Sequence, residues 1–207
     1  MLAGTLMLGG AGLVQAQDTG GSGAAATAQD QLATAKQLIG KDENGFLQRL
    51  HHANKMEIEL GQLALQKASD NDVKQFGQRM VTEHTAADQS LQAYAQKKGV
   101  TLSDSEPSPE NDTERAVMET GKAMKKQLEA LQGKAFQYAY LTHMVGDHDL
   151  DVSKVAAGME QYAANKELTT LLQSLGPKLT QHRERAYDLL GRHKARVHQA
   201  RSSPKGR

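Results

Sequence analysis

Four segments of the chain place apolar residues at alternating spacings of three and four, which is the repeat of an amphipathic α-helix. These segments cover residues 43–68, 71–98, 134–161 and 166–192. The chain has no Val/Ile-rich stretch that alternates apolar and polar residues as a strand would. The pattern therefore predicts an all-α fold built on four main helices.

The connections between these segments indicate how the helices pack. A short turn near residues 69–70 and another near Asn165 join the helices in pairs, whereas a long connection separates the two pairs. Within it, residues 100–112 hold two of the four prolines, so we expect a loop there, followed by a connecting helix at 113–132. This order is typical of a ferritin-like four-helix bundle with a long crossover containing an extra helix, although an up-down-up-down bundle also fits. Pro177 predicts a bend in the fourth helix.

The two ends of the chain lack such a stripe. Residues 1–16 are apolar, rich in small residues and end in Val14-Gln15-Ala16, which is typical of a signal peptide cleaved after Ala16. The basic start of such a peptide is missing, so we expect a longer signal whose start lies upstream. Residues 17–42 predict a flexible mature N-terminus, and residues 193–207 a disordered basic tail that anionic surfaces would attract weakly.

Each of the four helical stripes is interrupted by one ionisable residue at a position otherwise reserved for apolar packing. These residues are Glu57, His84, His148 and His182. Glu57 and His84 lie about 12 and 14 residues from the turn that joins their helices, so at ~1.5 Å per residue their levels differ by roughly 3 Å. His148 and His182 lie within roughly one helical turn of each other by the same rise. All four side chains are therefore expected to meet inside the bundle.

One carboxylate and three neutral imidazoles form a ligand set for a divalent first-row cation such as zinc, iron, manganese or copper. Met80 and Met144 each precede a stripe histidine by four residues. A thioether ligand at such a position would favour copper(I), whereas the ordinary role of a methionine there is to fill the core. Asp147 flanks His148 and is a candidate hydrogen-bond acceptor for that ligand. His51 and His52 begin a polar face and are weaker candidates.

Composition excludes several other classes of site. The chain has no Cys, which removes disulfides, thiolate zinc sites, iron–sulfur clusters and cysteine nucleophiles. The 25 Lys and Arg against 24 Asp and Glu give a net charge of +1. A chain with so little net charge has no general electrostatic attraction for nucleic acid, so we expect no nucleic-acid partner. We also expect no transmembrane span in the mature chain. The Glu-x-x-His motif of diiron oxidases is absent, and no hydrolase triad or phosphate loop is present.

Several short motifs resemble a bacterial family of exported ferritin-like proteins, domain of unknown function 4142, often labelled predicted outer membrane proteins. The matching elements are the Glu57 segment, Met80-Val81-Thr82-Glu83-His84, Met144-Val145-Gly146-Asp147-His148 and Leu179-Thr180-Gln181-His182. The resemblance spans residues 43–192 and implies a ferritin-like domain in the periplasm of a Gram-negative bacterium, free or associated with the envelope. The family typically has Phe-Asp where this chain has Phe136-Gln137.

Three functions are compatible with these observations. The first is an exported bundle that binds one divalent transition metal, in metal buffering or envelope stress, without catalytic turnover. The second is a mononuclear iron or copper redox enzyme that uses the same site. The third is a structural or interaction protein without metal, whose buried polar network fixes the register of the helices.

Overall fold

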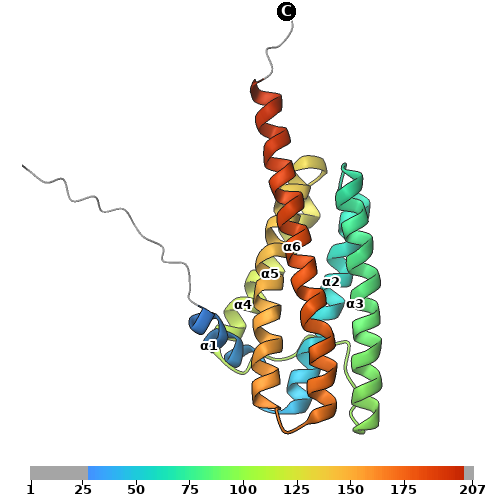
Figure 1. Cartoon of the computed structure of the whole chain (residues 1–207), viewed down its shortest axis with the longest axis vertical. Helices are drawn as coiled ribbons and strands as arrows, with labels where there is room; N and C mark the ends of the chain where they lie inside the picture. Colours follow the sequence, from blue (N-terminus) through green and yellow to red (C-terminus); the bar gives the residue numbers. More distant parts are fainter. Residues whose placement is uncertain (1–27, 203–207) are drawn as a thin grey trace, which may run out of the picture.

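The computed structural model describes residues 28–202 and is all-α, as predicted, with no strand in that part of the chain (Figure 1). The helices are α1 (Ala28–Leu38), α2 (Glu43–Lys67), α3 (Asn71–Lys97), α4 (Asp112–Ala130), α5 (Gly133–Gln161) and α6 (Lys166–Ser202). Side-chain caps fix three of the starts: Asp42, Asp70 and Asn111 each accept a backbone N–H from the first turn of α2, α3 and α4, respectively. No helix in the described residues is long and apolar enough to cross a membrane.

The helices form two antiparallel hairpins, α2 with α3 and α5 with α6, which pack together through α3 against α6 and α2 against α5. Helix α4 runs parallel to α2 on the outside of the bundle. Arg49 binds Glu114 at the start of α4, and Lys67 donates to the Glu129 carbonyl at its end. The crossover therefore returns the chain along the length of the bundle before α5 begins (Figure 1). This is the ferritin-like order, and the up-down-up-down alternative is wrong.

Two predictions for the ends of the bundle are corrected by the structure. Residues 28–38, expected to be flexible, form α1, which packs against α5 and α4 and buries Ala35, Leu38 and Ile39 at its end. The predicted disordered tail is helical as far as Ser202, and α6 continues through Pro177 without interruption. The predicted signal peptide, residues 1–16, lies outside the described residues.

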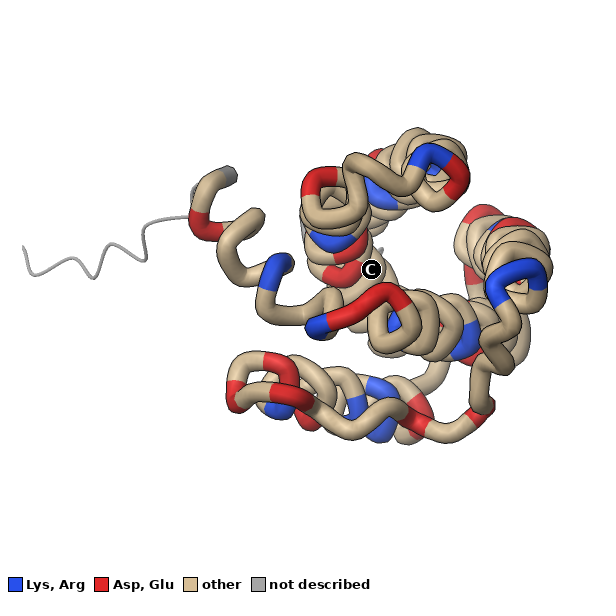
Figure 2. The backbone as a smooth tube through the Cα atoms, turned by 90° about the horizontal axis from the view of Figure 1, so that it is seen from below, with Lys and Arg blue, Asp and Glu red and all other residues tan. Residues whose placement is uncertain are grey.

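The core consists of two apolar clusters separated by a polar layer. On α3, for example, His84 lies between Met80 of the first cluster and Leu91 of the second. The same order recurs on the other three main helices, at Glu57, His148 and His182. The two pairs whose levels were compared in the sequence, Glu57 with His84 and His148 with His182, thus lie in one layer. Figure 2 looks along the helices and shows basic and acidic residues interspersed along them.

Two glycines allow α2 and α3 to approach closely. A Cβ added to Gly77 would lie 2.7 Å from the Cβ of Ala64 and 2.8 Å from the carbonyl oxygen of Gly61. A Cβ added to Gly61 would lie 2.7 Å from the Gly77 carbonyl oxygen. Since real side chains cannot approach so closely, the α2–α3 spacing depends on hydrogen at both positions.

Gln137 fixes the α2–α3 turn to α5. Its side-chain oxygen accepts the backbone N–H groups of Ser69 at 2.8 Å and of Asp70 at 3.0 Å, and also the Ser69 hydroxyl. All three contacts need only an acceptor, which a carboxylate would also supply. Gln137 therefore has a structural role, since it holds the α2–α3 turn against α5.

Candidate metal centre

Three of the four predicted ligands converge in the polar layer. His84 from α3, His148 from α5 and His182 from α6 are 4 %, 0 % and 1 % exposed, and one ring nitrogen from each lies within 4.8 Å of the other two. The ring centroids are 5.2–5.7 Å apart. The helices thus bring the three imidazoles together in the buried interior of the bundle.

The first two rings are each oriented by a hydrogen bond through Nδ1. His84 Nδ1 lies 2.9 Å from the side-chain oxygen of Asn54, and His148 Nδ1 lies 2.9 Å from the Met144 carbonyl oxygen. Both oxygens are acceptors, so each Nδ1 carries the proton and donates it. The Nε2 atoms of both rings are buried and have no hydrogen-bond partner among the described residues. Each therefore presents a free lone pair.

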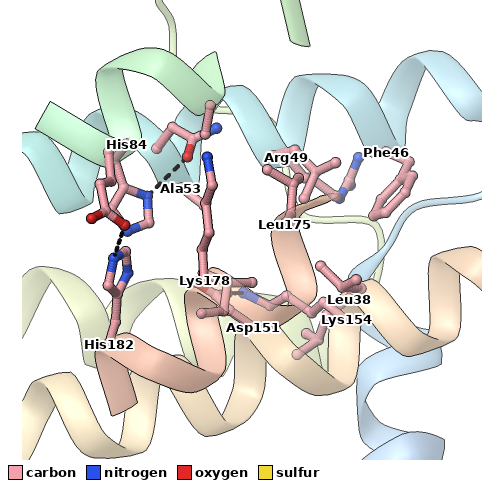
Figure 3. A pocket seen from close by; sticks show the side chains of 16 residues that line it. Leu38, Phe46, Arg49, Ala53, His84, Asp151, Lys154, Leu175, Lys178 and His182 are labelled. Carbon is pink, nitrogen blue, oxygen red and sulfur yellow. Dashed lines mark hydrogen bonds and ion pairs between the residues drawn. The ribbon is translucent and has the colours of Figure 1, made fainter. Parts of the chain in front are cut away.

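The third ring is held the other way round. His182 Nε2 donates to a carboxylate oxygen of Glu83 at 2.8 Å, and Nδ1 is the buried atom without a partner. Arg79 binds the other Glu83 oxygen at 2.7 Å and so holds that carboxylate in place. Dashed lines in Figure 3 mark the hydrogen bonds of His84 and His182. Metal-binding histidines in proteins are oriented in the same way, by an acceptor on the second ring nitrogen.

Burial keeps the three imidazoles neutral. Desolvation, followed by the neighbouring imidazoles, lowers the pKa of His84 well below its ordinary value. Desolvation also lowers the pKa of His148, and desolvation together with His148 lowers that of His182 to about 4. A neutral imidazole is the form that binds a metal, so these rings need no proton removed at pH 7.

The fourth predicted ligand, Glu57, does not join the histidines but faces two carboxylates of α5. One oxygen each from Glu57, Asp147 and Asp151 lies within 4.8 Å of the other two. Glu57 Oε1 is 3.8 Å from His148 Nδ1, but that nitrogen already donates to the Met144 carbonyl oxygen. The structure therefore divides the expected Glu/His/His/His set into a three-histidine group and an adjacent carboxylate group.

The accessory candidates also take different places from those expected. Asp147 belongs to the carboxylate group, and the acceptor for His148 is the Met144 carbonyl instead. The Met80 and Met144 side chains are fully buried in the first apolar cluster, as core filler would be. His51, expected on a polar face, is buried and bonds Asp88 through Nδ1 at 2.6 Å.

Three residues that shape the site were not identified from the sequence: Asn54, Glu83 and Asp151. Asn54 precedes Glu57 by three residues and Asp151 follows Asp147 by four, so both lie on faces already marked by a candidate. Those spacings were the available signal. Glu83 gave none, because its contact with His182 crosses from α3 to α6.

A small pocket with a volume of about 60 Å³ opens onto the histidine group (Figure 3). His84, His182 and Asp151 line it, together with Lys154 and Lys178. A volume of this size holds one or two water molecules. The site can therefore admit a small ligand next to the three nitrogens.

The family model of DUF4142, a domain of unknown function, matches residues 24–189. The chain belongs to the DUF4142 family. The match covers α1 to α5 and most of α6, and so includes every residue of both the histidine and carboxylate groups. Comparisons with curated proteins and with solved structures found no match. The family resemblance seen in the motifs is thus confirmed, whereas export and a place in the envelope stay predictions.

Proposed function

We propose that this DUF4142 protein binds one divalent transition metal through His84 Nε2, His148 Nε2 and His182 Nδ1. One observation carries the proposal: these three nitrogens are buried and unpartnered, the three rings each bring a nitrogen within 4.8 Å of the other two, and the other nitrogen of each ring is held by an acceptor. Three imidazoles suit zinc, iron(II) or copper, and an open fourth position would hold water or a small ligand.

The competing interpretation, a polar network that only fixes helix register, is less well supported. Buried polar atoms in such a network find partners within the protein, because an unpartnered one costs about 1–3 kcal/mol. Here one nitrogen of each of three adjacent rings lacks a partner among the described residues. A metal ion would supply the missing partner to all three at once.

The pocket beside His84 and His182 keeps a redox enzyme with one iron or copper as the second candidate function, because such chemistry needs an accessible coordination position. The predicted signal peptide at residues 1–16 favours action in the periplasm, in metal buffering or in the response to envelope stress. Peroxide turnover by the iron- or copper-loaded protein, lost in His182→Ala, would favour the enzyme over the buffer.

Metal binding is tested on the full chain after treatment with a chelator. We expect one equivalent of Co²⁺ to bind, with the intense visible absorption of a four- or five-coordinate ion, and Zn²⁺ to displace it. Removal of the hydrogen-bond partner of a metal ligand lowers metal affinity by about 10–100-fold. His84→Ala and His182→Ala remove a ligand itself, so each should reduce Zn²⁺ affinity by more than that. His193→Ala, a histidine of α6 outside the group, is the matched control. Equal affinity in all four proteins, or no saturable binding, would overturn the proposal.

A further inference from the structure

The carboxylate group, formed by Glu57, Asp147 and Asp151, has features of its own that the histidine site does not explain. Glu57 comes from α2, and the two aspartates follow one another by one turn on α5, so the group bridges two helices of the bundle. Acidic residues often cluster on protein surfaces without binding a cation. This group differs because Glu57 is only 1 % exposed and lies in the centre of the core.

Outside the carboxylate group, neither oxygen of the Glu57 side chain has a hydrogen-bond partner among the described residues. An unpartnered buried carboxyl group is costly whether or not it is ionised, and ionised carboxylates in cores are normally paired or bound to metal. One of these oxygens lies within 4.8 Å of an oxygen from each aspartate. The side chain is therefore aimed at the other two carboxylates, where a cation would contact all three.

A cavity leads from the outside of the bundle to this group. It has a volume of about 340 Å³, lies beneath α4 and extends to Asp147 and Asp151. His52 and His143 line the route, and Lys154 lies at its inner end. The pocket beside the histidines is a separate opening that also reaches Asp151 and Lys154. Cations can thus approach the carboxylates without passing the histidine group.

We propose that Glu57, Asp147 and Asp151 form a second cation site, selective for a hard divalent ion, next to the histidine site. Carboxylate oxygens are the ligands that Mg²⁺, Mn²⁺ and Ca²⁺ prefer, whereas imidazoles favour zinc, iron and copper. Lys154 Nζ lies 3.0 Å from Asp151 and supplies a positive charge in direct contact with the group. A bound ion replaces that contact, and Lys154 moves into the cavity that it already lines.

This second site goes beyond the proposed function and does not depend on it, because the two groups share no ligand atom. They are nevertheless close, since Glu57 Oε1 is 3.8 Å from the ring of His148. Two cations held by these neighbouring groups repel one another through a poorly screened interior. Filling one site should therefore weaken the other.

Mn²⁺ is the probe for the carboxylate site, measured by the loss of its free electron paramagnetic resonance signal in titrations of the full chain. With Zn²⁺ already bound, we expect one equivalent of Mn²⁺ to bind the wild type. Glu57→Gln and Asp147→Asn should each weaken Mn²⁺ binding at least tenfold. Asp149→Asn removes the same charge from α5 outside the group and should leave Mn²⁺ binding unchanged. Circular dichroism of each variant verifies that it is folded, and Asp147→Asn, at a partly exposed position, decides the matter if Glu57→Gln does not fold.

The outcomes separate this proposal from the histidine site. In His84→Ala, Zn²⁺ binding should be lost and Mn²⁺ binding retained. If Mn²⁺ binding also disappears there, the ion sits at the histidines and the second site is wrong. If Asp149→Asn weakens Mn²⁺ as strongly as Asp147→Asn, or if the wild type binds no Mn²⁺ either with or without Zn²⁺, the second site is wrong as well. Mn²⁺ binding without Zn²⁺ binding would contradict the histidine site alone.

Discussion

Acidification of the metal-free protein should reveal the buried, neutral state of His182. Burial and the neighbouring His148 lower the pKa of this ring to about 4, against an ordinary value of 6.5 that it regains on unfolding. Between those values the unfolded chain takes up a proton that the folded chain does not. The contribution of His182 to stability is therefore present above pH 6.5 and is lost as the pH falls toward 4. At ~1.4 kcal/mol per pH unit, the loss between pH 7.5 and pH 4.5 is about 2 to 3 kcal/mol.

The measurement is a urea denaturation of wild type and His182→Gln at both pH values, with chelator present throughout. Glutamine does not titrate and still offers a donor to Glu83, so other acid-sensitive groups cancel in the difference between the two proteins. The pKa of Glu83 is lowered in the folded protein, in part by its hydrogen bond with His182. The stability that this carboxylate contributes is likewise lost on acidification, so it forms part of the difference between the two proteins. Wild type should lose about 2 to 3 kcal/mol more than the variant on acidification. Equal losses in both proteins would show that the ring is not held neutral, and the argument for a free lone pair on Nδ1 would fail with it.

Three further predictions concern packing, the turn and the ligand shell. Gly77→Ala should lower the free energy of unfolding by about 1–3 kcal/mol, because α2 leaves no space for a methyl group. Gly121 has no atom within 4 Å of an added Cβ, so Gly121→Ala should raise the free energy of unfolding by up to about 1 kcal/mol, measured by urea denaturation. If both alanine variants shift the free energy of unfolding in the same direction, the close approach of α2 and α3 is contradicted. Gln137→Leu should cost about 1–3 kcal/mol, since two backbone N–H groups lose their acceptor, and an unchanged urea midpoint would refute that role. Glu83→Ala should weaken Zn²⁺ binding by about 10–100-fold in competition with a coloured chelator, because His182 loses the acceptor that orients it; full affinity would show that packing alone holds the ring.

The four main helices and their pairing could be read from the chain, because each carries a long apolar stripe broken at a single position and short turns join the helices in pairs. Helix α1 was missed for a physical reason. It has 11 residues, and a helix of that length is marginal in water unless other elements stabilise it. Its stability comes from burial of Ala35 and Ile39 and from the ion pair of Lys36 with Glu160 on α5. None of those contacts is visible in the local sequence.

The sequence predicted how far along the bundle the site residues lie, but not which neighbouring helix each side chain faces. Counting residues from a turn fixes how far along the bundle a side chain lies, and that arithmetic placed Glu57 level with the histidines. It does not fix the angle around the helix axis relative to a neighbouring helix. Asp147 and Asp151 lie on one side of α5, beside the face that carries His148, and that side meets α2. Glu57 therefore faces carboxylates although it shares a layer with imidazoles.

If the two proposed sites bind cations, the polar layer serves binding more than folding. The apolar clusters on either side of it already join the same helices, so the layer is not needed to hold the bundle together. Its unpartnered atoms belong to Glu57 and the three histidines, and each lowers the stability of the metal-free protein. Burial also raises the pKa of Glu57, and the charge of Asp147 raises it further, so keeping that carboxylate ionised adds to the cost. Cations at the two groups would offset these costs together, and a chain selected for stability alone would place apolar side chains there.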